Sequence, residues 1–266
     1  TMTITVTPPS VGGSVSSNQV ICSGTAPANL ALSGHTGSVV KWQKDDNAAF
    51  SSPIDVGGIS TNLLSTTIGN LTETTYFRAV VQNGTCPVAY SSYATITITP
   101  LNTISLTSAS GTDAQSICIN SPITDITYTT TGATGATFSG LPTGVTGSWS
   151  GNVATISGTP SVTSGSPYTY TITLTGGCGS IGKTGTITST PIVTPTFTQV
   201  AAICSGETLS ALPTTSTNGI TGTWAPALNN TNTTTYTFTP TAGQCATTTT
   251  MTITVTPPSV GGSVSS

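Results

Sequence analysis

The sequence has very little charge. Of its 266 residues, four are Lys or Arg and seven are Asp or Glu, so charged residues make up 4%, against roughly 25% in an ordinary soluble domain. The four cations are too few to form a basic stripe that would neutralise nucleic-acid phosphates. They are Lys41, Lys44, Arg78 and Lys183. We therefore expect no nucleic-acid partner, and a surface hydrated mainly by the hydroxyl groups of Thr and Ser.

Long apolar runs are also absent. No run approaches the 18 or more residues of a membrane span, so we expect no membrane span in this segment. The chain opens with Thr rather than with an initiator Met or a signal peptide. We expect the targeting signals to lie elsewhere in a parent chain.

The residue sets of catalytic and metal sites are missing as well. His35 is the only histidine, no GxSxG elbow accompanies it, and SGHTG is typical of a turn. There is no CxxC pair for zinc and no DxDxDG loop for calcium. Weak cation binding at Asp45-Asp46 stays open, although a solvated loop is the interpretation we favour. We predict no catalytic residue, cofactor or metal.

The most informative feature that is present is an internal duplication. Residues 1–17, TMTITVTPPSVGGSVSS, recur letter for letter as residues 250–266. The match indicates one 249-residue period (250 − 1) plus a 17-residue overlap, as in a tandem repeat protein. We therefore expect this chain to be a segment of a longer array, whose partners include further copies of the same repeat.

Within one period, three segments share one ending. Each has a Tyr-led β-run, a turn that contains Gly, one Cys, and an alternating strand that stops at Pro. The three read TTYFRAVVQNGTC, then on to Pro100; YTYTITLTGGC, then on to Pro191; and TTTYTFTPTAGQC, then on to Pro257. Alternation of Thr with aliphatic residues marks half-buried strands, and the Gly, Pro and Asn turns favour antiparallel sandwiches. The sequence predicts an all-β tandem array of three immunoglobulin-like antiparallel β-sandwich modules per repeat.

The duplication also sets the expected module limits. They are 1–7 for the last strand of a preceding third module, 8–99 for module 1, 100–190 for module 2, 191–256 for module 3, and 257–266 for the first strand of a following module 1. We predict extended joints at Pro100, Pro191 and Pro257, because proline has no N–H to continue a ladder. The unpaired end strands allow head-to-tail exchange between chains, although fraying is the simpler interpretation.

The cysteines fall two per module, one early and one late. They are Cys22 and Cys86, Cys118 and Cys178, and Cys204 and Cys245. Fifteen sets of pairings are possible in principle, but separate modules favour pairing inside each one, early with late. We therefore predict one disulfide in each module and an oxidising, extracellular setting at the cell surface.

Four aromatic residues have predicted roles. Trp42 and Trp224 lie where a core tryptophan on a central strand is expected, and Tyr76 after Leu71 is similar to a tyrosine corner, so we predict these three as core aromatics. Trp149, in GSWSG, is the candidate ligand contact for a polysaccharide. Packing over a sheet edge is the interpretation of Trp149 that we favour.

Several segments resemble a known family. ICSGTAPANLALSGHTGSVVKWQ and ICSGETLSAL, with the endings quoted above, resemble the immunoglobulin-like and PKD-like tandem repeats of giant cell-surface adhesins of gliding and biofilm-forming Bacteroidota. In the middle module, LPTGV followed by ISGTP resembles the LPxGL…ISGTP pattern of an Ig, cadherin-like bacterial family. The resemblance implies secretion across an outer membrane by a type IX route.

Together these features predict a non-enzymatic structural repeat of a long extracellular adhesin or surface filament, which acts as a disulfide-clamped, semi-rigid stalk. Neighbouring chains would then associate laterally or head to tail. An array of modules that binds carbohydrate or another surface is the alternative, and a Thr-rich ice-binding face is a remote third.

Overall fold

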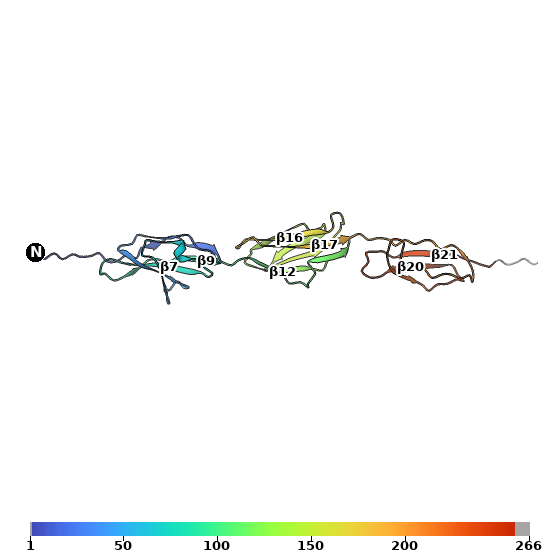
Figure 1. Ribbon diagram of the computed structural model, residues 1–266, viewed down its shortest axis with the longest axis horizontal. Coiled ribbons are helices and arrows are strands. Elements are labelled where there is room, and N and C mark those ends of the chain that lie inside the picture. Colours follow the sequence, from blue (N-terminus) through green and yellow to red (C-terminus); the bar gives the residue numbers. More distant parts are fainter. Residues whose placement is uncertain (1, 259–266) are drawn as a thin grey trace, which may run out of the picture.

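The computed structural model describes residues 2–258, in which three β-modules follow one another along the long axis of the molecule (Figure 1). Each module has its own hydrophobic core, and the buried residues of the three cores run from Leu30 to Ile96, from Ile104 to Ile187, and from Leu212 to Ile253. Within the described part of the chain, the only helix is α1 (Ser65–Ile68), and no helix is long and apolar enough to cross a membrane. The prediction of an all-β chain is confirmed.

Module 1 is a sandwich of two sheets. One sheet has the order β1 (Ser14–Val15), β3 (Leu30–Ser33), β6 (Asn62–Leu63), and the other has the order β2 (Gln19–Cys22), β9 (Ala94–Thr99), β7 (Thr75–Gln82), β4 (Ser38–Asp45), β5 (Ile54–Val56), with β8 (Ala89–Tyr90) also paired to β7. Trp42 on β4 is completely buried, and its indole N–H donates to Ser60 O (2.9 Å). The core therefore forms around Trp42.

Module 2 has two four-stranded sheets. Their orders are β10 (Thr103–Leu106), β12 (Ile126–Thr131), β15 (Val153–Gly158), β14 (Val145–Ser150), and β11 (Ala114–Cys118), β17 (Gly182–Thr190), β16 (Tyr168–Thr175), β13 (Gly135–Ser139). Alternation along β16 buries Tyr170, Ile172 and Leu174 and turns the threonines between them away from the core. The Thr/aliphatic pattern thus places one face of each strand in the core.

Module 3 has the shortest strands. β19 (Gly222–Ala225), β20 (Thr234–Pro240) and β21 (Thr249–Ile253) form one antiparallel sheet, and β18 (Ile203–Cys204) pairs with β22 (Val255–Thr256). Trp224 is half-buried, and its ring packs against Phe197 and Phe238 at centroid distances of 4.8 and 5.2 Å. These rings fill the core of the smallest module.

One predicted core residue is corrected by the structure. Tyr76 is half-buried on the outer face of β7 and packs edge-on against Tyr93 (5.5 Å), while its neighbour Phe77 is fully buried. Successive residues of a strand face opposite ways, and the inward positions of β7 include Thr75 and Phe77. The residue that behaves as a tyrosine corner is Tyr236 in module 3, whose buried hydroxyl group accepts from Asn229 N–H (2.8 Å).

The two ends of the repeat differ in what the structure describes. Residues 2–7, part of the predicted last strand of a preceding module, form no strand here. The predicted first strand of a following module lies mostly in residues 259–266, outside the described residues. Thr7 nevertheless lies against module 1, with its carbonyl oxygen 3.9 Å from the sulfur of Cys86.

Candidate functional site

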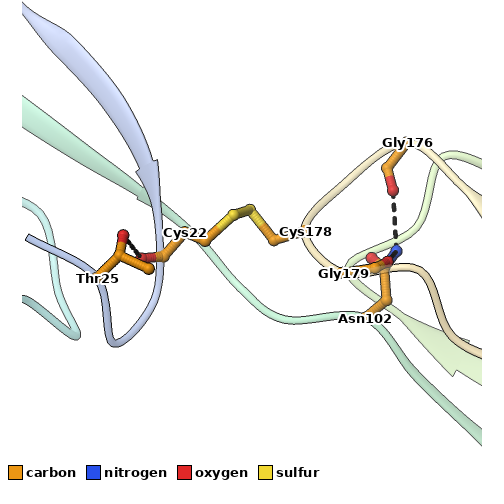
Figure 2. Close-up of a disulfide and its surroundings, with 6 residues drawn as sticks. All are labelled: Cys22, Thr25, Asn102, Gly176, Cys178 and Gly179. Carbon is orange, nitrogen blue, oxygen red and sulfur yellow. Dashed lines mark hydrogen bonds between the residues drawn. A yellow bond between two sulfur atoms is a disulfide. The ribbon is translucent and has the colours of Figure 1, made fainter.

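Both disulfides of the structure join different modules. Cys22 of module 1 is bonded to Cys178 of module 2, and Cys118 of module 2 is bonded to Cys245 of module 3, with Cα–Cα distances of 5.6 and 5.4 Å. The predicted pairings within modules are therefore wrong. Figure 2 shows Cys22 and Cys178 reaching toward each other from two separate modules.

The reason is that each early cysteine lies at the far pole of its module. The short strand β2 runs parallel to the last strand β9, and their final pair is Cys22 with Thr99, the residue before Pro100. In the same way β11 runs parallel to β17, with Cys118 opposite Thr190 just before Pro191. Each early cysteine thus lies beside the exit of its own module.

Each late cysteine lies at the opposite pole, beside the entry of its module. Cys178 forms a parallel bridge with Leu101, the residue after Pro100, and Cys178 O accepts from Asn102 N–H (2.7 Å). In module 3, Cys245 O accepts from Val193 N–H (2.9 Å). Because early and late cysteines of one module occupy opposite poles, a bond between them would have to span the length of the sandwich.

At the first joint, the peptide and the disulfide cross side by side. The peptide crosses through Thr99, Pro100 and Leu101, and the disulfide connects the two residues that pair with Thr99 and Leu101. Pro100, Pro191 and Pro257 are all exposed. Each bridged joint therefore has two covalent connections, one of them through proline.

Asn102 holds the turn that carries Cys178. Its side chain is completely buried, and Nδ2 donates to Gly176 O (2.9 Å) and to Gly179 O (2.8 Å), on both sides of the cysteine (Figure 2). Sequence reasoning missed this residue, because an Asn two positions after a proline has many other uses. The structure shows that it ties the joint to the bridge.

The late cysteines follow glycines with positive φ. Gly84, Gly177 and Gly243 have φ of 57°, 61° and 89°, and they precede Cys86, Cys178 and Cys245 by one or two residues. Residues other than Gly seldom adopt this left-handed backbone conformation. The Gly-containing turn visible in the sequence therefore places each late cysteine at the entry pole of its module.

The remaining cysteines, Cys86 and Cys204, carry no disulfide in this chain. Cys86 is half-buried and Cys204 is exposed. Cys86 is the late cysteine of module 1, and Cys204 is the early cysteine of module 3. They therefore lie at the two outer poles of the row of modules.

The candidate ligand contact Trp149 lies on β14, one of the two edge strands of its sheet. It is half-buried, packs against the core of module 2, and donates from its indole N–H to Thr130 Oγ1 (3.0 Å). This is the packing over a sheet edge that we favoured. The indole N–H of Trp149 is thus already bonded within the module.

The Asp45-Asp46 loop forms part of a pocket that Glu73 also lines. Burial works against the charge of Asp45, but hydrogen bonds from Ser52 N–H and Asn47 N–H keep the pKa of its carboxyl below the usual range. These N–H groups occupy both carboxylate oxygens. Among residues 2–258, no group of three His, Cys, Asp or Glu side chains is arranged to hold a metal ion.

Comparisons with known proteins agree with this architecture. Three-domain fragments of titin, domains I67–I69, align with 94% and 96% of the chain and with 99% and 100% of their own lengths. Their TM-scores are 0.56 and 0.54, at 10% sequence identity, the first being an E-to-A variant. The fold is that of tandem immunoglobulin domains.

Sequence families add less. The family model described as "Domain of unknown function (DUF8696)" matches residues 11–100, which is about the extent of module 1. No curated protein matches the chain. The likeness to titin, at 10% identity, shows the fold alone.

Proposed function

We propose that this chain is a non-enzymatic structural repeat of a long extracellular adhesin or surface filament, in which disulfides clamp the joints between modules. The observation that carries the proposal is that both disulfides bridge adjacent modules beside a proline joint. In an ordinary tandem array the joint is the flexible point, since a single peptide strand connects the domains. Here the joint is the point with most covalent connections.

A second covalent connection changes what a joint can do. A joint made of the peptide chain alone lets the neighbouring modules bend and twist. A joint made of the peptide chain and a disulfide loses most of the twisting and can bend in one direction only. The hydrogen bonds from Asn102 to the Cys178 turn hold the two attachments together. The result is a rod that keeps its direction over several modules.

The bridges also limit extension under tension. Cys22 and Cys178 are 156 residues apart in sequence, and Cys118 and Cys245 are 127 apart. Force that arrives at Cys22 passes directly to Cys178, so the residues between them cannot be drawn out even if module 1 unfolds. Each bridge also contributes about 5 kcal/mol to stability by the loop-entropy estimate.

An extracellular setting supports the same proposal. Disulfides persist mainly in oxidising compartments. A chain with 4% charged residues, whose surface is hydrated mainly by Thr and Ser, depends little on salt or pH. The resemblance to repeats of Bacteroidota surface adhesins favours a cell surface as the place of attachment. Such repeats set the reach and stiffness of a stalk.

The test is solution scattering of matched variants. In the background Cys86→Ser/Cys204→Ser, which leaves both bridges intact, we expect one narrow maximum dimension that matches a straight row of three modules. Adding Cys22→Ser and Cys178→Ser frees the first joint, and the radius of gyration should fall as the modules bend. Adding Cys118→Ser and Cys245→Ser instead should free the second joint to a similar degree. Identical scattering from all three proteins would overturn the proposed clamp.

A further inference from the structure

The two unbridged cysteines stand in the same local structures as the bridged ones. Early cysteines sit at the start of a turn in which the residue two positions later has positive φ: Gly24 (83°), Asn120 (63°) and Gly206 (87°). In each turn the N–H three positions on donates to the cysteine carbonyl, at 3.1, 3.1 and 3.0 Å from Thr25, Ser121 and Glu207. Cys204 is therefore presented as Cys22 and Cys118 are.

The attachment of this turn to the last strand is repeated as well. The residue after each early cysteine donates its N–H to the residue before the joint proline: Ser23 to Thr99, Ile119 to Thr190 and Ser205 to Thr256, each at 2.9 Å. Cys204 thus lies beside Thr256 and Pro257, in the position from which Cys22 and Cys118 reach the next module. Its sulfur lies 3.8 Å from Thr256 Oγ1.

Cys86 stands at the entry of module 1 as the other late cysteines stand at theirs. Its sulfur lies 3.5 Å from Pro8 O and 3.9 Å from Thr7 O. At the other two entries the N–H two positions after the joint proline, of Asn102 or Val193, donates to the cysteine carbonyl. At the entry of module 1 the Gln82 side chain donates to Cys86 O (2.9 Å). Asn83 adds a hydrogen bond from Nδ2 to Pro8 O (2.9 Å).

The duplication brings these two cysteines to one place. Thr7 and Thr256 are the same residue of the repeat, because residues 1–17 equal residues 250–266. Cys86 lies at Thr7 and Cys204 lies at Thr256. We propose that Cys204 of one copy forms a disulfide with Cys86 of the copy that follows it, so that the seam between copies is bridged like the joints within a copy.

The reaction is an ordinary disulfide exchange. The thiolate of one cysteine attacks a disulfide oxidant, and the other thiolate then displaces it, which leaves the Cys204–Cys86 bond and two reduced thiols of the oxidant. Two protons and two electrons leave the protein thiols. The oxidant belongs to the class of disulfide-bonded exchange catalysts, or of small-molecule disulfides such as oxidised glutathione.

A bridged seam makes the array a continuous covalent ladder. The shortest covalent path along the array crosses each disulfide and follows the backbone only from one disulfide to the next. The backbone segments are 26 residues from Cys178 to Cys204 of one copy, 32 from Cys86 to Cys118 of the next copy, and 26 from Cys245 of that copy to the Cys22 that follows. These three segments contain 84 residues in total, and the set recurs once in every two copies, which contain 498 residues. At about 3.5 Å per residue, two fully unfolded copies would reach about 290 Å instead of about 1,700 Å.

The test is a thiol count in a two-copy chain, made of residues 1–266 followed by a second copy of residues 18–266, and produced in an oxidising compartment. We then substitute Cys86→Ser in the first copy and Cys204→Ser in the second. Cys204 of the first copy and Cys86 of the second are now the only cysteines that the bridges within the copies leave unpaired. Alkylation in denaturant should find no free thiol, and the chain should run as a monomer on a non-reducing gel. Two free thiols, or a disulfide-linked dimer, would overturn the proposal.

A matched control and a second readout protect the test against misfolding. If the first copy also carries Cys204→Ser, Cys86 of the second copy has no partner and one free thiol should appear. Without any substitution, the two-copy chain should have two free thiols, one at each outer pole, as a single copy does. Four free thiols in that chain would show that the seam is open.

Discussion

At the scale of single residues, buried polar side chains hold the joints and the cores. Asn102 is completely buried at the first joint, and both N–H groups of its amide are used on the turn of Cys178. In the core of module 2, the hydroxyl groups of Tyr128 and Tyr170 lie 3.1 Å apart and are hydrogen-bonded to each other. A buried polar group that loses its partner is costly, so both arrangements are open to test.

Asn102→Asp should loosen the first bridge. The substitution keeps the shape of the side chain but replaces the two donated hydrogen bonds with a carboxylate oxygen that faces two carbonyl oxygens, at a cost of about 2 kcal/mol or more. We expect Cys22–Cys178 to be reduced faster by dithiothreitol, while Cys118–Cys245 in the same molecule keeps its rate. Asn70→Asp, at an exposed position, is the control. Equal acceleration of both bridges would contradict the role of Asn102.

The tyrosine pair should make module 2 sensitive to alkali. Burial raises the pKa of both hydroxyl groups above the ordinary value near 10. Below pH 10 both tyrosines are neutral in the folded and unfolded states, so their contribution to stability is complete. As the pH rises above 10 the unfolded state ionises first, and the free energy of unfolding falls.

Urea unfolding of the thiol-blocked protein between pH 8 and pH 11 measures this effect. The double variant Tyr128→Phe/Tyr170→Phe should lose less stability over that range than the parent. At pH 8 the double variant should also be more stable than either single variant, because each single variant leaves one hydroxyl group buried without a partner. A double variant with the pH slope of the parent would show that the pair does not carry the dependence.

At the scale of elements, the decisive unit is the short strand that runs parallel to the last strand of its module. β2, β11 and β18 all take this place, and each ends in a cysteine followed by a turn with one residue at positive φ. The parallel direction carries the cysteine to the exit pole. The same unit therefore produces the same connection at both joints of the chain, and it presents Cys204 of module 3 in the same way.

The turn after Cys22 tests how much this element depends on glycine. Nothing lies within 4 Å of a Cβ built on Gly24, so the cost of Gly24→Ala is the left-handed backbone alone, about 1 to 2 kcal/mol. Gly24→Asn should cost less, because Asn120 occupies the equivalent position in module 2 with φ of 63°. Thermal unfolding should therefore rank the parent highest, Asn next and Ala lowest. Equal melting temperatures for Asn and Ala would contradict this reading of the turn.

The elements also show how far sequence alone could go. Alternation along the strands and the turn residues were sufficient for the all-β fold, and Trp42 lies fully buried. Alternation carries no information on which strand lies parallel to which, so the pole of each cysteine, and with it the pairing, could not be predicted. The prediction that Tyr76 is a core residue was wrong for a related reason. Tyr76 and Phe77 are adjacent aromatic residues on β7, so only one of them can face the core, and the sequence does not show which one does.

At the scale of the whole molecule, three immunoglobulin-like modules stand in a row with a disulfide across each of the two joints (Figure 1). The four disulfide-bonded cysteines connect neighbouring modules, and none of them closes a loop within its own module. In the proposed stalk, opening a bridge would free a joint and lengthen the chain that tension can draw out.

Trypsin digestion without reduction tests this pairing of the cysteines directly. With only four cations, the chain is cut after Lys41, Lys44, Arg78 and Lys183, which leaves the cysteines in the peptides 1–41, 79–183 and 184–266. After free thiols are blocked, mass spectrometry should find these three peptides joined in one species, through Cys22–Cys178 and Cys118–Cys245. Release of 184–266 as a separate peptide, with 1–41 still attached to 79–183, would show pairing inside the modules and contradict the account.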